Sequence, residues 1–336
     1  MISNVRVRNF GPIQKLDWKP SPGINILIGE NATGKTFLLK ALYATVRSVE
    51  EFEKGDDNRS YKQVISDKLW WVFQPSKLAD LVSKGSNRLE LQATVDNMRV
   101  GFSFSASAEK QVGEVKTPRK RRENNSLFIP AKEVLSFANI IKETRGIHKR
   151  FGFDDTYYDL TLALEPETRM GNNYRGFSEA REALKHQIKG KLTFDPSDGW
   201  LFKEGNTTHP IKLAAEGIKK VCILDRLLGN RMLSPDSFIF FDEPDALLHP
   251  NAVATLMDVI KTLANVGIQI FIATHSYAVL KKSHIYALRK QTIPISVVSL
   301  SDKGPSIHDL RDGMPDNPII DSSIRLYEEE MDTVYR

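Results

Sequence analysis

An apolar run that leads into a glycine-bounded octet constrains the fold of this chain more than any other feature. The run covers residues 23–28 (GINILI), and the octet at 29–36 (GENATGKT) matches G-x-x-x-x-G-K-[ST]. In that pattern, consecutive backbone N–H groups turn inward toward the phosphates of a nucleotide. An apolar-periodic segment follows from Phe37 to about Gly55, and it predicts a helix whose N-terminus points at those phosphates. The junction therefore predicts a buried strand, a phosphate-binding loop and a helix.

All eight loop residues are expected to contact the nucleotide. They are Gly29, Glu30, Asn31, Ala32, Thr33, Gly34, Lys35 and Thr36. Lys35 is expected to place its charge on the β and γ oxygens, and the Thr36 hydroxyl is the expected ligand of Mg²⁺. With average residue frequencies, such an octet arises by chance in roughly one chain in a hundred of this length. The strand and helix that flank it make a surface glycine turn a weaker interpretation.

Two later apolar strands end in polar residues of the kind that a phosphate loop needs. The strand at 237–241 ends in Asp242 and Glu243, and the strand at 268–272 leads into His275. A carboxylate beside a phosphate loop holds Mg²⁺, directly or through water, and the next carboxylate can polarise an attacking water. A histidine at such a strand end can reach a γ-phosphate. A strand followed by an acidic turn is the alternative for either stretch alone, but the pattern occurs twice in order.

The spacing of these motifs predicts that other structure is inserted between them. Lys35 and Asp242 lie 207 residues apart, which is far more than one strand–helix–strand crossover requires. Alternating apolar residues at 88–105 predict a β-hairpin, and the stretch at 191–212 predicts a second antiparallel patch. Residues 132–190 read mainly as helices without a sustained heptad, which excludes a long coiled-coil arm.

Four stretches together resemble the ATPase heads of the ABC superfamily, in the branch that contains SMC, RecF and OLD-type proteins. They are VRVRNFGPI, INILIGENATGKT, FIFFDEPDALLHP and IFIATHS. The chain looks most like the small ATPases called AAA_15 or AAA_21. The resemblance implies an α/β fold of the P-loop NTPase class, as one ABC-type ATPase domain over 1–336. Its nucleotide-binding core is expected at 1–60 and 205–310, an inserted β and helical subdomain at 61–204, and a C-terminal helix at 311–336.

The resemblance also implies roles for single residues. Asp242 would be the Walker-B aspartate associated with Mg²⁺, Glu243 the catalytic base and His275 the switch histidine. Residues 245–249 would form the D-loop, which crosses between two heads.

Two further family motifs depart from their usual pattern in this sequence. The signature segment falls at 213–220, where Ala215 stands in place of the usual serine and Gly217 is retained. Ala215 and Gly217 would face the ATP of a second head. The glutamine loop falls at 126–132, which contains no glutamine.

For function, the resemblance implies a slow ATPase that forms a head-to-head homodimer around ATP and Mg²⁺. Such small ATPases resemble subunits of bacterial two-component anti-phage systems, such as Septu, and the expected partner is a separate nuclease or toxin effector. Only 61 residues follow His275, too few for the nuclease domain of OLD-type proteins. A RecF- or SMC-like DNA-binding ATPase in DNA repair is the alternative. The energising subunit of a membrane transporter is disfavoured by the 207-residue spacing and by the lack of LSGGQ.

Composition sets the remaining expectations. The single cysteine, Cys222, excludes a disulfide framework, and neither a signal peptide nor a run of about 18 apolar residues is present, so a cytoplasmic protein without a membrane partner is expected. The formal charge of +5 permits nucleic acid as a partner. The basic stretch at 116–122 reads either as a phosphate contact or as a solvated loop. Trp70 and Trp71 read as core or as a partner surface, with core favoured.

Overall fold

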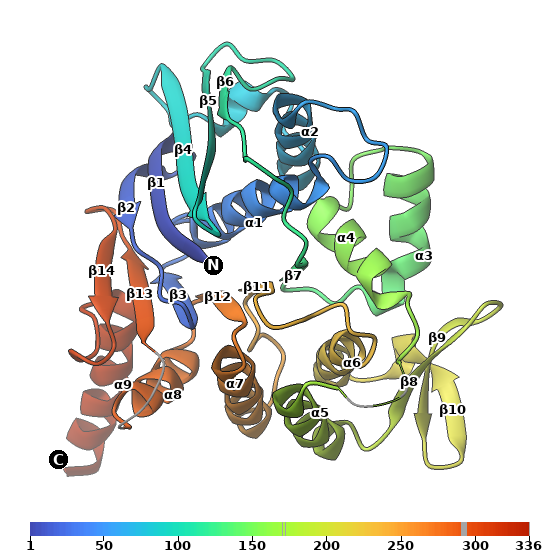
Figure 1. Cartoon of the computed structure of the whole chain (residues 1–336). Helices are drawn as coiled ribbons and strands as arrows, with labels where there is room; N and C mark the ends of the chain where they lie inside the picture. Colours follow the sequence, from blue (N-terminus) through green and yellow to red (C-terminus); the bar gives the residue numbers. More distant parts are fainter. Residues whose placement is uncertain (170, 172, 290–293, 336) are drawn as a thin grey trace.

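A largely parallel sheet forms the centre of the structure, a computed structural model that describes residues 1–169, 171, 173–289 and 294–335 (Figure 1). Its strand order in this part of the chain is β14-β13-β3-β12-β11-β7. The strands are β3 (Ile24–Gly29), β7 (Ser126–Ile129), β11 (Phe238–Asp242), β12 (Gln269–Thr274), β13 (Ile295–Leu300) and β14 (Ser306–Asp309). All neighbours pair in parallel except β14 with β13. The carboxyl ends of the five parallel strands therefore lie at one edge.

The two faces of this sheet bury different cores because side chains alternate along each strand. On β11, Ile239 and Phe241 belong to one hydrophobic cluster, whereas Phe238 and Phe240 belong to the other. The first cluster includes side chains from α4 (Asp155–Leu164), α5 (Arg175–Ile188), α6 (Glu216–Gly229), α7 (Pro250–Asn265) and α8 (Tyr277–Ala287). The second includes side chains from α1 (Lys35–Glu51) and α2 (Tyr61–Phe73). The parallel sheet is thus covered on both faces, as expected for an α/β fold.

A second, antiparallel sheet covers α1 (Figure 1). Its order is β2-β1-β4-β5-β6, formed by β1 (Ile2–Phe10), β2 (Ile13–Trp18), β4 (Arg88–Val95), β5 (Met98–Ser105) and β6 (Glu114–Lys116). The predicted hairpin at 88–105 is confirmed as β4 and β5. Its two turn residues, Asp96 and Asn97, both have positive φ, which is typical of a tight hairpin turn.

The predicted antiparallel patch at 191–212 is confirmed as a third sheet of order β10-β9-β8. It contains β8 (Lys191–Asp195), β9 (Gly199–Glu204) and β10 (Thr207–Pro210). The region before it is helical, with α3 (Ala138–Ile141) leading into a π-helical segment (Lys142–Ile147). The C-terminal helix α9 (Pro318–Tyr335) is within the predicted 311–336. Across the described ranges, no helix combines the length and apolar character needed to cross a membrane.

Strand β7 lies inside 61–204, the range predicted for the inserted subdomain, yet it belongs to the central sheet. Its four residues are buried, and Phe128 pairs with Phe240 of β11. Conversely, β1 and β2 lie within the predicted core range 1–60 but belong to the antiparallel sheet. The core and insertion therefore alternate along the chain more often than the motif spacing predicts.

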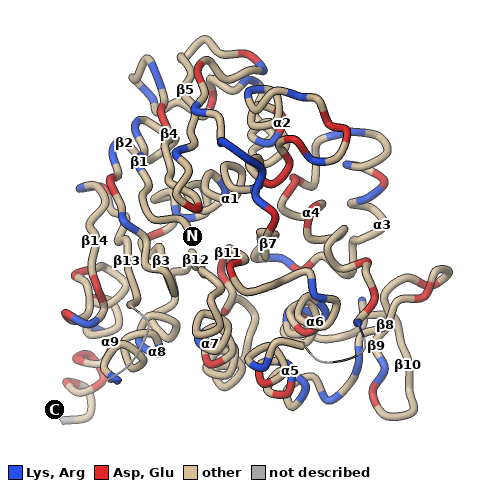
Figure 2. The backbone as a smooth tube through the Cα atoms, in the orientation of Figure 1, with Lys and Arg blue, Asp and Glu red and all other residues tan. Residues whose placement is uncertain are grey.

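The basic stretch at 116–122 is only partly a solvated loop (Figure 2). Arg122 is buried and its guanidinium lies 3.1 Å from Glu50 and 2.9 Å from Asp96. Burial raises the pKa of the Glu50 carboxyl, and the neighbouring Arg47 and Arg122 act against that shift. Arg122 is therefore a structural residue that joins α1 to the antiparallel sheet, whereas Arg119 and Lys120 are exposed. Cys222 is buried in the core.

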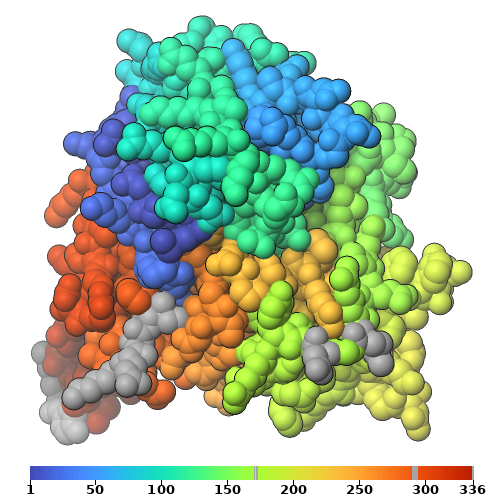
Figure 3. Space-filling view, viewed as in Figure 1, coloured from blue at the N-terminus to red at the C-terminus, as the bar shows by residue number. Residues whose placement is uncertain are grey.

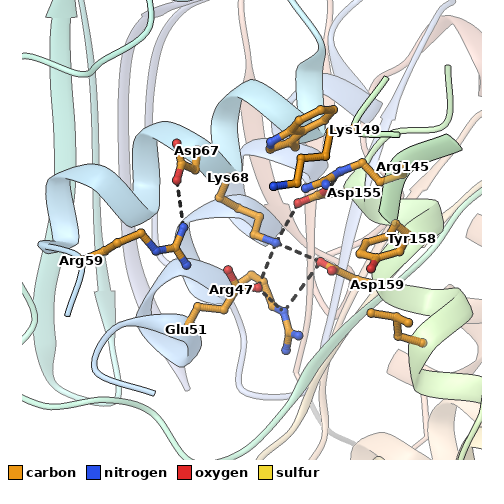
Figure 4. A pocket seen from close by; sticks show the side chains of 12 residues that line it. Arg47, Glu51, Arg59, Asp67, Lys68, Arg145, Lys149, Asp155, Tyr158 and Asp159 are labelled. Carbon is orange, nitrogen blue, oxygen red and sulfur yellow. Dashed lines mark hydrogen bonds and ion pairs between the residues drawn. The ribbon is translucent and has the colours of Figure 1, made fainter. Parts of the chain in front are cut away.

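An ion-pair network links α1, α2 and α4 beside a cavity of about 410 Å³ (Figure 4). At its centre, the buried Lys68 ammonium lies 2.9 Å from Glu51, 2.9 Å from Asp155 and 3.2 Å from Asp159. Burial by itself lowers the pKa of Lys68, but the three carboxylates outweigh it and hold the pKa above its usual range. Lys68 thus fixes α4 against the helix that follows the octet.

Lys68→Met is expected to lower the free energy of unfolding by about 3–5 kcal/mol, because it leaves buried carboxylates without their cation. Urea unfolding followed by circular dichroism measures the loss. Lys62→Met, at a half-buried position of the same helix, is the control and is expected to change stability by less than about 1 kcal/mol. Equal stability of the Lys68 variant and the wild type would contradict this role.

Candidate nucleotide-binding site

The loop at 29–34 joins β3 to α1, and two of its glycines have conformations that other residues rarely adopt. Gly29 has φ of 153°, and a Cβ there would lie 2.3 Å from the carbonyl oxygen of Leu300. Gly34 has φ of 99° and is the N-cap residue of α1. The backbone therefore turns sharply at both ends of the loop, and the free N–H groups of the first turn of α1 lie at the carboxyl edge of the sheet.

Lys35 is held inside this loop. Its ammonium donates hydrogen bonds of 2.8 Å to the carbonyl oxygens of Gly29 and Glu30, and its side chain is buried. Burial lowers the pKa of Lys35, while the carboxylates of Glu243 and Asp242 act in the opposite direction. A cation at this position is placed to receive an anion at the mouth of the loop.

The loop meets β11 through a hydrogen bond between residues 206 positions apart. The Thr36 hydroxyl donates to Oδ1 of Asp242 at 2.6 Å. Asp242 is 9% exposed, and burial raises the pKa of its carboxyl, partly offset by the Thr36 hydrogen bond. This oxygen pair suits Mg²⁺, which takes one or two protein ligands and completes its shell with water and phosphate oxygens. Among the described residues, no group of three or more His, Cys, Asp or Glu side chains is placed to hold a metal ion.

Glu243 and His275 lie side by side at the same edge. Oε2 of Glu243 is 2.9 Å from Nδ1 of His275, and the His275 backbone N–H donates to the same oxygen at 3.3 Å. Glu243 has φ of 46°, a conformation that the hydrogen bond from its N–H to the Ala273 carbonyl supports at 2.8 Å. A non-glycine residue in this conformation is often found at functional sites. The His275 side chain is 58% exposed and therefore accessible to a ligand.

Hydrogen bonds join the segment after Glu243 to two neighbouring elements, β12 and α6. The Thr274 hydroxyl donates to Oδ1 of Asp245 at 2.9 Å. From α6, the Lys220 ammonium donates to the carbonyl oxygens of Glu243 and Ala246 at 3.2 and 2.9 Å. Burial lowers the pKa of Lys220, and the nearby carboxylates act against this shift. These hydrogen bonds join α6 directly to the segment that carries Glu243.

The predicted signature residues lie outside this constellation within the single chain. Ala215 is the exposed N-cap of α6, and its side chain accepts no capping hydrogen bond. Gly217 faces Leu248, since a Cβ on it would lie 2.9 Å from that side chain. No hydrogen bond or ion pair in the described part of the chain joins either residue to the 29–36 loop. Leu213 and Leu247 are 75% and 74% exposed, so the predicted signature and D-loop segments each expose a large apolar side chain.

Helix α4 approaches the site, which the sequence analysis did not predict. The Lys40 ammonium of α1 donates to Asp154, the N-cap of α4, at 2.6 Å. Burial raises the pKa of Tyr157 to about 12, and the charges of Asp154 and Asp242 add to that shift. The only local signal was an aspartate at a helix start, which is too common to indicate a site. The predicted glutamine-loop segment, 126–132, contains β7 and the three residues after it at the carboxyl edge of the sheet, and its role stays a prediction.

Comparison with known proteins gives a family and a set of more distant relatives. The AAA_21 family, described as an AAA domain, putative AbiEii toxin, Type IV TA system, matches residues 24–281, well over half of the chain. The DNA replication and repair protein RecF of Limosilactobacillus fermentum is 26% identical over 119 residues, 34% of this chain and 30% of that protein. RecF of Listeria monocytogenes serotype 4b is 23% identical over 150 residues, 45% of this chain and 36% of that protein. The chain thus spans about a third of the length of these curated relatives.

Solved structures of SMC heads share the fold. An SMC head bound to the C-winged helix domain of ScpA gives a TM-score of 0.54 at 17% identity, covering 92% of this chain and 97% of that one. A Pyrococcus furiosus SMC head with an extended coiled coil, bound to the C-terminal domain of ScpA, gives 0.52 at 14% identity, covering 98% and 99%. The family match is consistent with the strand–loop–helix junction at 24–51 and with the polar residues grouped at the sheet edge. The chain belongs to the AAA_21 family, and it has the fold of an ABC-type ATPase head as seen in SMC proteins.

Proposed function

We propose that this protein binds and slowly hydrolyses ATP, dimerises around it, and thereby controls a separate nuclease or toxin effector in bacterial anti-phage defence. The observation that carries the nucleotide part is the convergence of three separate chain segments at one sheet edge. These segments provide Lys35 and Thr36, Asp242 and Glu243, and His275. Their charges and hydroxyl groups match what a nucleoside triphosphate with Mg²⁺ requires.

In this proposal the loop N–H groups and Lys35 bind the β and γ phosphates. The phosphate oxygens replace the Gly29 and Glu30 carbonyls that now accept hydrogen bonds from the Lys35 ammonium. Thr36 and Asp242 hold Mg²⁺, which supplies positive charge to the phosphate oxygens. Glu243 accepts a proton from the attacking water, and His275, within 2.9 Å of that carboxylate, orients it and reaches the γ-phosphate.

A second copy completes the site in this proposal. The helix α6 begins at an exposed N-terminus, and a helix N-terminus favours anions. Ala215 and Gly217 would therefore face the partner's γ-phosphate through backbone N–H groups, because Ala215 carries no hydroxyl. The exposed Leu213 and Leu247 would be buried on closure. The lost hydroxyl contact is a physical reason to expect weak closure and slow turnover.

Two findings support an effector as the client of the ATPase. The AAA_21 description names a putative AbiEii toxin and a type IV toxin–antitoxin system, so the family is described in connection with toxins. The SMC head structures were solved with a second protein, ScpA, bound to the head, so heads of this fold can carry a separately folded partner. Both observations concern relatives, and the effector of this chain is identified here only by class.

A RecF-like ATPase that acts on DNA is the second candidate, and the sequence similarity to RecF proteins favours it. Lys116, Arg119 and Lys120 are the exposed cations of the stretch at 116–122, whereas Arg121 is half-buried and Arg122 is buried. Their number is small for phosphate-backbone binding, which gains affinity with each neutralised phosphate.

The two candidates predict different responses to DNA. ATP turnover of the purified chain is expected to change by less than about twofold when double-stranded DNA is added at low salt. A RecF-like function instead predicts stimulation that falls steeply with salt. The steady-state ATPase rate with and without DNA, at two salt concentrations, distinguishes them. Strong, salt-sensitive stimulation would replace the proposed function with the second candidate.

Glu243→Gln is expected to keep ATP affinity within about threefold and to lower the hydrolysis rate by about 10²–10⁴-fold, since general-base catalysis is lost. The ATP-bound dimer should accumulate, which sedimentation in Mg-ATP detects. Glu182→Gln, at an exposed position on α5, is the matched control and should hydrolyse at the wild-type rate. Unchanged turnover in the Glu243 variant would refute its role as base.

Lys35→Ala is expected to reduce ATP affinity by at least about 100-fold, because the phosphates lose their main cationic partner. Titration with a fluorescent ATP analogue measures this loss. Lys19→Ala removes an exposed lysine outside the loop and should bind normally. Wild-type affinity in the Lys35 variant would break the assignment of the 29–36 loop.

A further inference from the structure

The C-terminal helix α9 leaves the head after its first turn. Ile319 and Ile320 pack against the hydrophobic cluster on the α5–α8 face, and α9 contacts α8. The rest of α9 continues away from the sheets and ends at the lower left of the molecule (Figures 1 and 3). An isolated helix of this length is marginally stable in water. The outer turns of α9 therefore gain from a partner that covers them.

Five apolar residues of α9 form one narrow stripe, and Leu326, which is 68% exposed, lies outside it. Ile320, Ile324, Tyr327, Met331 and Val334 follow one another at intervals of four, three, four and three residues. This is the spacing of a coiled-coil seam. Ile324, Tyr327 and Val334 are 50%, 60% and 67% exposed, so the seam is covered only at its inner end.

The charged residues beside this seam indicate which charge a partner helix should carry. Glu328 and Glu330 lie beside the seam residues Tyr327 and Met331. In a coiled coil, residues at these two flanking positions face the flanks of the partner helix. The helix carries five carboxylates and one arginine among its described residues (Figure 2). Pairing of two α9 helices would bring like charges together and is therefore disfavoured. The seam requires a partner that is basic.

Helix α8 presents a matching stripe. Ala278, Lys281, Ile285 and Leu288 follow at intervals of three, four and three residues, and all four are exposed. Lys281 is one of the two inner positions of this stripe, and it makes no ion pair with another residue in the described ranges. Both stripes span ten residue steps, from 278 to 288 and from 324 to 334, or about 15 Å at 1.5 Å per residue. The two stripes are thus complementary in length and charge.

We propose that α9 of one copy packs along α8 of a second copy, and that the second copy returns the same contact. Within one chain the two helices are neighbours, yet each leaves its stripe exposed, so the chain does not satisfy this pairing by itself. Each chain carries both α9 and the helix α8 that would receive the α9 of the other copy. Such a self-complementary surface suits a closed two-fold dimer. This interface uses α8 and α9, whereas the ATP-dependent closure proposed above uses the loop at 29–36 and the α6 N-terminus. It therefore forms without nucleotide.

Charge reversal across the two stripes tests the interface. Sedimentation of the full chain without nucleotide should give a dimer. Lys281→Glu alone, and Glu328→Lys with Glu330→Lys, should each raise the dimer dissociation constant at least tenfold. An equimolar mixture of these two variants should dimerise again, because each α9 then meets an α8 of opposite charge. Misfolded variants cannot produce that recovery. Glu329→Lys, outside the seam and its flanks, is the matched control and should dimerise as the wild type does.

A cross-link gives an independent readout. Ile285→Cys in one tagged chain and Tyr327→Cys in another should form a mixed disulfide on mild oxidation. The native Cys222 is buried and its pKa is raised to about 12, so it does not compete. Replacing Tyr327→Cys by Glu329→Cys should abolish the mixed product. A wild-type chain that stays monomeric without nucleotide, or a variant mixture that stays monomeric, would overturn the proposal. Loss of ATP binding in the Lys35 variant tests the proposed function separately and leaves this dimer intact.

Discussion

The hydrogen bond from the Thr36 hydroxyl to the Asp242 carboxylate joins the two halves of the molecule at the place where the proposed chemistry occurs. Its length of 2.6 Å depends on the register of β3, β12 and β11, which pair in parallel so that Gly29, Thr274 and Asp242 reach the same edge. A slip of one residue in either pairing would turn Asp242 away from the loop, because successive side chains point to opposite faces. The site therefore depends on the packing of two separate hydrophobic cores that hold this sheet in place.

The architecture also explains how structure outside the nucleotide core can act on it. Lys40 ties α1 to Asp154 at the start of α4, and Lys68 ties α2 to Asp155 and Asp159 on the same helix. Lys220 joins α6 to the segment that follows Asp242 by hydrogen bonds to two carbonyl oxygens. Lys40 and Lys68 join elements that are far apart in the sequence, whereas Lys220 joins α6 to the segment after the next strand along the chain. The helical insertion and α6 are therefore positioned to respond to a ligand at the loop, which is what a regulatory ATPase requires.

The convergence of the loop with the two strand ends could be predicted from the sequence, because the motifs are local and the rule that joins them is general. The roles of these residues in ATP binding and hydrolysis stay proposals. The octet at 29–36, the acidic strand end at Asp242 and the histidine after β12 each stand out by themselves, and parallel strands place their carboxyl ends together. Strand β7 was not predicted as part of this sheet, since a strand of only four residues carries no information about a partner strand more than 100 residues away. Arg122 was grouped with a basic stretch because sequence reports a charge and not its buried partners. The roles of Ala215 and Gly217 stay predictions that concern a second copy.

The central claim is that the edge formed by β3, β11 and β12 is a Mg-ATP site. Calorimetric titration of the wild-type chain with ATP, in the presence of Mg²⁺ and again with EDTA, tests it most directly. The account predicts one ATP per chain with Mg²⁺ and clearly weaker binding with EDTA, because Thr36 and Asp242 then hold no ion. Absence of ATP binding at millimolar nucleotide, or equal affinity with and without Mg²⁺, would contradict it.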